Sequence, residues 1–284
     1  MEGHPATDNL CAVFRRFSLV VLVLAIASAC AGARHEPATP VAAAAGPALA
    51  APASPTITLS IVGTNDLHGG IVAREGRGGL ALFGGYVANL RAARARDGGA
   101  VLLLDGGDMF QGTLESNLAE GATVVAAYNA LGYAAAAIGN HEFDFGPVGP
   151  AATPQSPADD PRGALKARAA EARFPFLAAN IIDTTTNRPV AWPNVMPTTT
   201  VRVGGVRVGI IGVVTLGALS ATIASNTNGL RIAPLVETIE AEGLRLRAAG
   251  ADVVIVTAHA GGRCAAFDNP ADLSSGDVPV AVEI

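Results

Sequence analysis

Cysteine is scarce in this sequence of 284 residues, and its three copies do not form a disulfide framework. Cys11 and Cys30 fall within the first thirty residues, and Cys264 stands alone towards the other end. A small fold that depends on disulfides carries an even set of closely spaced cysteines. The fold must therefore be stabilised by its apolar core, and a composition with 50% hydrophobic residues supplies one.

Charged residues are also few, at 15% of the sequence, and the formal net charge is −5. Lysine and arginine form no continuous basic run. This argues against a nucleic-acid partner, because binding to a phosphate backbone needs clustered positive charge. A polyanionic ligand would need another local source of positive charge, such as a bound metal ion.

The first 29 residues have the features of a signal peptide. Two arginines precede the apolar stretch at 17–29, which is short for a membrane span but has the length of a secretory h-region. The stretch ends in Ala-Ser-Ala before Cys30, which is a cleavage pattern, so we expect export to the periplasm or the extracellular space. Two interpretations of Cys30 stay open: an ordinary thiol, or a lipidated cysteine that anchors a lipoprotein to the membrane. Residues 30–55, rich in Ala and Pro, are expected to form a flexible tether.

Strand-like and helix-like segments alternate along the rest of the chain. Short apolar runs predict strands over 57–63, 100–104, 133–138, 176–180 and 252–258. Helix-like segments lie between them at 79–96, 114–131, 161–173 and 234–249. Gly204-Gly205 separates two Val-Arg-Val runs, which is typical of a tight β-hairpin. The pattern predicts a layered α/β fold with a buried, mixed sheet.

Polar side chains follow four of these strands at the point where each strand ends. The four segments are TNDLHGG from residue 64, DGGDMFQG from 105, GNHEFDFG from 139 and HAGG from 259. Ligands of open α/β sheets collect at the carboxyl ends of the strands, so we expect the four loops to converge in one crevice. Their glycines permit the close backbone approach that such a site needs.

The residue types in these loops indicate a metal site. Asp66 and His68 are two residues apart, so on an extended segment both side chains point the same way and can bind one ion. Asp108 can give one oxygen to each of two ions, and Asn140 and His259 offer an oxygen and a nitrogen to the second. Such mixed ligands suit Zn, Mn or Fe better than Ca or Mg. Two divalent ions bound by two carboxylates would keep a net charge of about +2, which would balance the charge of a phosphoryl dianion.

Two further side chains, His141 and Asp144, are predicted to form a catalytic pair. His141 can protonate the leaving oxygen or stabilise the transition state, while Asp144 holds its tautomer. Asp105 is expected to hydrogen-bond the backbone or a ligand histidine rather than a metal ion. Glu142 is expected to face solvent or to cap a helix. The simpler alternatives are that Asp66 only caps the following segment and that a histidine after an apolar strand belongs to the core.

Taken in order, the four motifs resemble those of the calcineurin-like metallophosphoesterases, in particular the bacterial 5′-nucleotidases. The resemblance runs from about Thr56 to the end of the chain. It implies a four-layered α/β/β/α sandwich and a small-molecule phosphate ester, such as a nucleotide, as the substrate. It also implies that the first ion is held by Asp66, His68 and Asp108, the second by Asp108, Asn140 and His259, and that the catalytic pair is His141 and Asp144.

One feature of that family has no counterpart here. Its members carry a later G-H-x-H motif, which gives one histidine to each ion, and then a C-terminal domain that binds the nucleoside. No histidine follows His259 in this sequence, so each ion is expected to have three protein ligands. We therefore expect residues 56–284 to be an incomplete metallophosphoesterase domain. Two hypotheses follow: an exported two-metal hydrolase of nucleotides, or a remnant that folds without turning over substrate.

Overall fold

The computed structural model describes residues 56–76 and 78–260. The predicted signal peptide, the predicted tether and Cys30 lie outside the described residues, so their assignments stay predictions. Among the helices in 56–76 and 78–260, none has both the length and the apolar character needed to cross a membrane.

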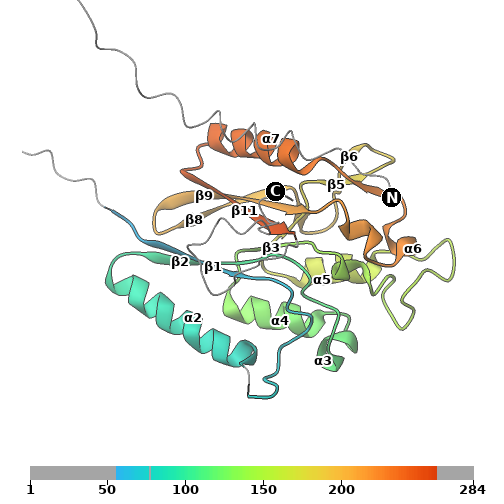
Figure 1. The fold of residues 1–284 in the computed structure, drawn as a ribbon, viewed down its shortest axis with the longest axis horizontal. Coiled ribbons are helices and arrows are strands. Elements are labelled where there is room, and N and C mark those ends of the chain that lie inside the picture. Colours follow the sequence, from blue (N-terminus) through green and yellow to red (C-terminus); the bar gives the residue numbers. More distant parts are fainter. Residues whose placement is uncertain (1–55, 77, 261–284) are drawn as a thin grey trace, which may run out of the picture. The chain divides into compact units, whose positions relative to one another are not determined.

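A five-stranded sheet forms the first half of the fold, in the order β1-β2-β3-β4-β7. Every neighbouring pair in it is parallel. Its strands are β1 (Leu59–Thr64), β2 (Ala100–Asp105), β3 (Ala135–Ala137), β4 (Phe176–Leu177) and β7 (Val195–Met196). One side of the sheet is covered by the helices α2 (Gly79–Arg96), α4 (Ala122–Leu131) and α5 (Gly163–Glu171), as Figure 1 shows.

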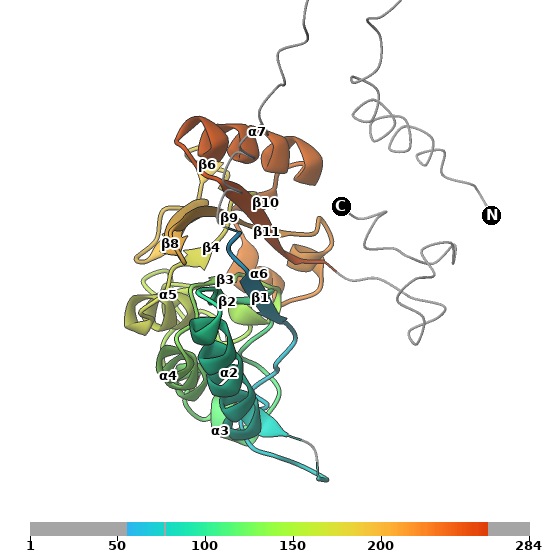
Figure 2. The same cartoon turned by 90° about the vertical axis from the view of Figure 1, so that its left-hand side faces the viewer.

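A second, three-stranded sheet faces the first. It consists of β8 (Thr198–Val203), β9 (Val206–Val214) and β11 (Val253–His259), in the order β11-β9-β8. The predicted hairpin is confirmed, because Val203 pairs with Val206 across Gly204-Gly205. Since β11 runs parallel to β9, this sheet is mixed, as expected. Helix α7 (Leu235–Ala248) covers its outer side (Figure 2).

Three apolar cores separate the layers. Along β2, Leu103 packs towards the helices while Leu102 and Leu104 pack against the second sheet, as the two-residue period of a strand requires. Along β9, Ile210 packs into the core between the sheets and Ile211 into the core beneath α7. The order of layers is therefore helix, sheet, sheet, helix, and the predicted α/β/β/α sandwich is confirmed.

Short elements at one side of the sandwich were not predicted. They include a small antiparallel sheet in the order β10-β5-β6 and several helices of three or four residues. The short elements are β5 (Ile181–Asp183), β6 (Arg188–Pro189), β10 (Leu230–Ile232), η1 (His141–Phe143), η2 (Ala218–Ser220) and α6 (Ala224–Thr227). One of them, η1, carries His141 of the site described below, and α6 carries Asn226, which donates a hydrogen bond to the Phe143 carbonyl of η1. Helix α3 (Leu114–Asn117) is also short, but it lies within the helix predicted over 114–131.

Two predicted elements differ from the structure. The helix predicted over 114–131 is broken in two, because Glu120 and Gly121 both have positive φ, 49° and 84°. The strand predicted over 176–180 ends at Leu177. Beyond it the buried Asn180 side chain accepts a hydrogen bond from the Val214 backbone N–H, at 3.0 Å, and donates one to its C=O, at 2.7 Å. A side-chain amide thus replaces the backbone partner that a longer strand would offer.

Candidate metal centre

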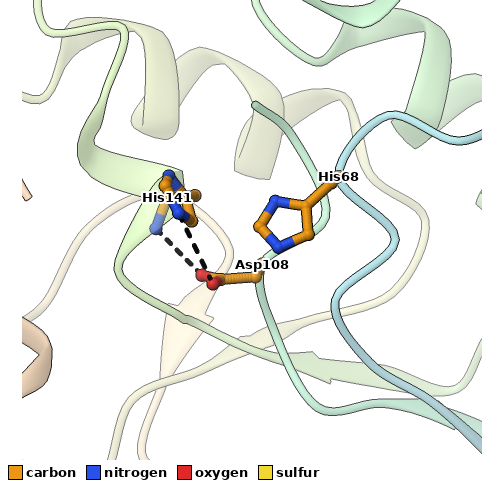
Figure 3. Close-up of side chains that lie close together, drawn as sticks. All are labelled: His68, Asp108 and His141. Carbon is orange, nitrogen blue, oxygen red and sulfur yellow. Dashed lines mark hydrogen bonds and ion pairs between the residues drawn. The ribbon is translucent and has the colours of Figure 1, made fainter. Parts of the chain in front are cut away.

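The four predicted loops converge at the carboxyl ends of β1, β2, β3 and β11, with Asp108 at their centre. The Asp108 side chain is only 5% exposed, and its Oδ2 lies 3.3 Å from His259 Nε2 and 4.0 Å from His141 Nε2. Figure 3 shows Asp108 between His141 and His68, whose rings meet edge to face at 4.9 Å between centroids. Segments more than 150 residues apart in the chain thus share one carboxylate, and the prediction that these loops converge is confirmed.

Two groups of candidate ligands share Asp108. One joins Asp108 to His68 and His141, and the other joins it to Asp66 and His259; within each group the donor atoms lie within 4.8 Å of one another. A common carboxylate is what a bridge between two ions requires. The division of Asp66 and His68 differs from the predicted one, in which both serve the first ion, although their Oδ1 and Nε2 atoms lie only 3.7 Å apart. The predicted division stays a prediction.

The histidines and the amide have their ligand atoms turned inwards. His68 Nδ1 lies 2.9 Å from the Gln111 carbonyl, to which it donates, so Nε2 keeps a free lone pair. His259 Nε2 lies 3.0 Å from Asn140 Oδ1 as well as 3.3 Å from Asp108 Oδ2. Without an ion, a proton on His259 holds these oxygens together. A divalent cation would do the same, so the donor set fits the metal chemistry that the sequence predicts.

The backbone at three candidate ligands is left-handed. The φ angles are 50° at Asp66, 47° at His68 and 58° at Asp108, where side chains other than glycine are uncommon. The assumption of an extended 66–68 segment is therefore wrong, although the two side chains do approach each other. The conformation is held by hydrogen bonds of 3.0 Å from the Asp66 N–H to the Gly107 carbonyl and from the His68 N–H to the Asp108 carbonyl. Such strain, of order 1–3 kcal/mol per residue, is concentrated at functional sites.

His141 and Asp144, the predicted catalytic pair, contact each other directly. His141 Nδ1 is hydrogen-bonded to Asp144 Oδ2, three residues later, on the turn that contains η1. Because an ionised carboxylate only accepts, Nδ1 carries the proton and Nε2 points towards Asp108. Thr222 donates to the other oxygen, Asp144 Oδ1, at 2.8 Å. No motif in the sequence marks Thr222, which lies 78 residues beyond its partner.

Glu142 is buried, and the expectation that it faces solvent or caps a helix is wrong. Its carboxylate accepts backbone N–H groups from Asp108 at 2.9 Å, Met109 at 2.7 Å and Gly139 at 2.7 Å. These bonds tie the loop after β2 to the loop after β3. Burial, reinforced by the charge of Asp108, raises the pKa of Glu142 to about 7. The local sequence does not reveal this role, because all three donors are backbone groups.

Asp105 plays the part predicted for it. It accepts hydrogen bonds from Thr64 Oγ1 at 2.6 Å, Tyr128 Oη at 2.7 Å and the Gly107 N–H at 2.8 Å, and it is fully buried. Burial outweighs these bonds and raises its pKa to about 6. Its backbone carbonyl accepts Thr257 Oγ1 at 2.7 Å, which links β2 to β11 beneath the site. The residue supports the Asp108 loop without entering the ligand cluster.

Asp108 and His259 favour each other's charged forms. Burial disfavours the Asp108 carboxylate, but hydrogen bonds from the His259 ring and the His141 backbone N–H lower its pKa below the ordinary value. Burial likewise disfavours the imidazolium of His259, and the hydrogen bond to Asp108 overcomes it, so the pKa of His259 is raised. Each member of this contact therefore stabilises the charged form of the other.

Known proteins are similar to this chain in both sequence and fold. No family model matches it. The UshA protein of Salmonella pullorum is 36% identical over 148 residues, which cover 52% of this chain and 24% of that protein. The snake venom 5′-nucleotidase of Gloydius brevicauda is 31% identical over 220 residues, 74% of this chain and 34% of the relative. The 5′-nucleotidase precursor of Thermus thermophilus has a TM-score of 0.56 at 31% identity, over 71% of this chain and 37% of that one.

The chain belongs to the calcineurin-like metallophosphoesterase superfamily. A calcineurin-like phosphoesterase of Bacillus subtilis, YfkN, shares the fold with a TM-score of 0.55 at 24% identity. The chain spans only about a quarter to a third of the length of these curated relatives. What the whole relatives act on is taken up below as a proposal.

Proposed function

We propose that the chain is the metal-binding part of an exported two-metal enzyme that hydrolyses phosphate esters of nucleotides. The observation that carries the proposal is the position of Asp108, whose carboxylate belongs to two groups of candidate ligands and lies beside the His141–Asp144 pair. An isolated metal site or a structural ion pair would not need a histidine held in one tautomer at its edge. Phosphoester hydrolysis does, because the leaving oxygen must gain a proton.

The candidate ligands are Asp66, His68, Asp108, Asn140 and His259, and the ions that they suit are Zn, Mn or Fe. Bound ions would supply the positive charge that stabilises a phosphoryl group in its transition state and lowers the pKa of water. The chain's own part is to bring the ligand side chains together on strained loops, which are fixed by the buried carboxylates of Asp105 and Glu142. A preformed arrangement needs less reorganisation at each turnover.

His141 is the residue that moves a proton. Its Nδ1–H is donated to Asp144, and the opposite nitrogen, Nε2, lies 4.0 Å from Asp108 Oδ2, where a phosphate ester bound at the cluster could reach it. When protonated, Nε2 donates to the leaving oxygen of the ester, and Asp144 stabilises the imidazolium until that transfer. A positioned acid or base of this kind contributes about 10²- to 10⁴-fold in rate.

The substrate class and the location rest on different evidence. Several relatives are named as 5′-nucleotidases, which supports a nucleotide as the ester. Export is supported by the leader-like first 29 residues and by one relative's origin in snake venom. The alternative of a remnant without turnover is separated from the enzyme by direct assay.

The test is hydrolysis by the full chain with added Mn²⁺ or Zn²⁺, measured as phosphate released from an aryl phosphate and from nucleoside monophosphates. We expect His141→Ala to lower the rate by about 10²-fold or more while bound metal, measured by elemental analysis, stays constant. A fall in metal content would make His141 a ligand instead. If the unaltered chain releases no phosphate at any metal concentration, the proposed activity is wrong for this chain.

A further inference from the structure

The dipeptide Ala221–Thr222 contacts both parts of the candidate site. The Ala221 carbonyl accepts the side-chain N–H of Asn140 at 3.4 Å, and the Thr222 hydroxyl donates to Asp144 Oδ1 at 2.8 Å. Asn140 is a candidate metal ligand, whereas Asp144 holds the catalytic histidine. Two adjacent residues therefore orient one candidate metal ligand, Asn140, and one member of the catalytic pair, Asp144.

The dipeptide is itself firmly held. The segment that carries it follows β9 directly, and its first residue, Thr215, donates its N–H to the carbonyl of His259, the last residue of β11, at 3.0 Å. Just beyond the dipeptide, the fully buried Asn226 donates to the Phe143 and Ala152 carbonyls, at 2.8 Å each. One of these carbonyls lies on the turn that contains His141. The segment 215–226 is thus fixed to both the β11 side and the β3 side of the site.

The hydroxyl of Thr222 completes the hydrogen bonding of the Asp144 carboxylate. One oxygen accepts from His141 and the other from Thr222, so the plane of the carboxylate is fixed from both ends. The Asp144 side chain is 16% exposed and that of His141 29% exposed, so water can reach the pair. Without the hydroxyl, water would bind Oδ1 in several geometries, and the imidazole would lose its single orientation.

We propose that Thr222 is a positioning residue that orients the His141 ring through Asp144. The catalytic consequence rests on the proposed function, but the geometric one does not. An aliphatic side chain of the same shape removes only the hydrogen bond, so Thr222→Val is the informative change, and Thr222→Ser restores the donor. Thr238→Val is the matched control, because the Thr238 hydroxyl in the first turns of α7 donates to the carbonyl of Pro234, the residue before that helix.

The geometric test is nitrogen NMR of the full chain labelled at histidine, without metal and at one fixed pH. The chain has only five histidines, and His141 is assigned by the signal that disappears in His141→Gln. We expect the unaltered chain to show His141 with its proton on Nδ1. Thr222→Val should shift or broaden that signal, Thr222→Ser should restore it, and Thr238→Val should leave it unchanged. A Thr222→Val spectrum identical to that of the unaltered chain at His141 would overturn the proposal.

The catalytic test compares esters that differ in their leaving group. A poor leaving group, such as the ribose oxygen of a nucleoside monophosphate, depends on protonation more than a 4-nitrophenolate does. We expect Thr222→Val to slow the nucleotide at least several-fold more than the aryl ester, with metal content and melting temperature unchanged. Equal slowing of both esters would contradict the assigned role. If the unaltered chain hydrolyses neither, the proposed function fails, and the NMR result still decides the positioning of His141.

Discussion

Gly139 is the position at which one added methyl group should damage the site most directly. A Cβ built on Gly139 would lie 2.2 Å from Asp108 Oδ1 and 2.6 Å from the Asp108 backbone nitrogen. The backbone of Gly139 does not have a positive φ, so an alanine there is not strained by its own conformation. The whole effect of Gly139→Ala must therefore come from the displacement of Asp108.

The expected cost follows from the contacts that are lost. Overpacking by one methyl group costs about 1–3 kcal/mol. Displacing Asp108 also weakens its hydrogen bonds with Glu142 and with the His141 N–H, both 2.9 Å long. Adding about 1 kcal/mol for these, we expect Gly139→Ala to lower the free energy of unfolding by about 3 kcal/mol. At roughly 2–4 °C per kcal/mol, the melting temperature should fall by about 6–12 °C.

Urea unfolding and metal titration of the same protein form the assay. The control is Gly85→Ala in α2, because nothing lies within 4 Å of a Cβ there. That change should stabilise the protein by about 0.5–1 kcal/mol and leave metal affinity unchanged. Metal affinity of Gly139→Ala should drop at least 10-fold, as for changes in residues that support ligands. If Gly139→Ala bound metal as well as Gly85→Ala does and were equally stable, the described contact between Gly139 and Asp108 would be wrong.

Two further predictions concern a buried acid and the leader. Burial raises the pKa of Asp105 in the folded state to about 6, against an ordinary 3.8, so the native state holds this proton more tightly than the unfolded state does. The free energy of unfolding should therefore fall as pH rises from about 4 to 6, by up to about 3 kcal/mol. Unfolding free energies measured at pH 4 and pH 7 should show that loss for the unaltered chain and not for Asp105→Asn; equal pH dependence in both would refute it. If Cys30 is lipidated, labelled palmitate should enter the exported chain and be absent from Cys30→Ala, whereas recovery of cytoplasmic protein with an intact leader would refute export.

The sequence predicted the parts of the fold that depend on periodicity. Alternating apolar residues in β2 and β9 place side chains on both faces of each sheet, and this period is visible in the chain. Local backbone conformation was harder to predict from the sequence. Positive φ at Glu120 divided a helix that its composition favoured, and an Asn180 side chain ended a strand early.

The candidate site likewise contains residues that the sequence predicts and residues that it does not. Ligand-type residues at strand ends could be found because strand ends converge, and Asp108 lies where expected. Glu142 and Thr222 were misplaced or missed for a physical reason. Their contacts are to backbone N–H groups or to a residue distant in the chain, and neither kind of contact leaves a pattern in the sequence.

We propose that two ions share the carboxylate of Asp108. Elemental analysis of the full chain after equilibration with excess Mn²⁺ and removal of free metal measures it most directly. We expect two ions per chain, a value that falls towards zero in Asp108→Ala and towards one in His68→Ala. A stoichiometry of two in Asp108→Ala, or equal small losses in both variants, would contradict the shared carboxylate.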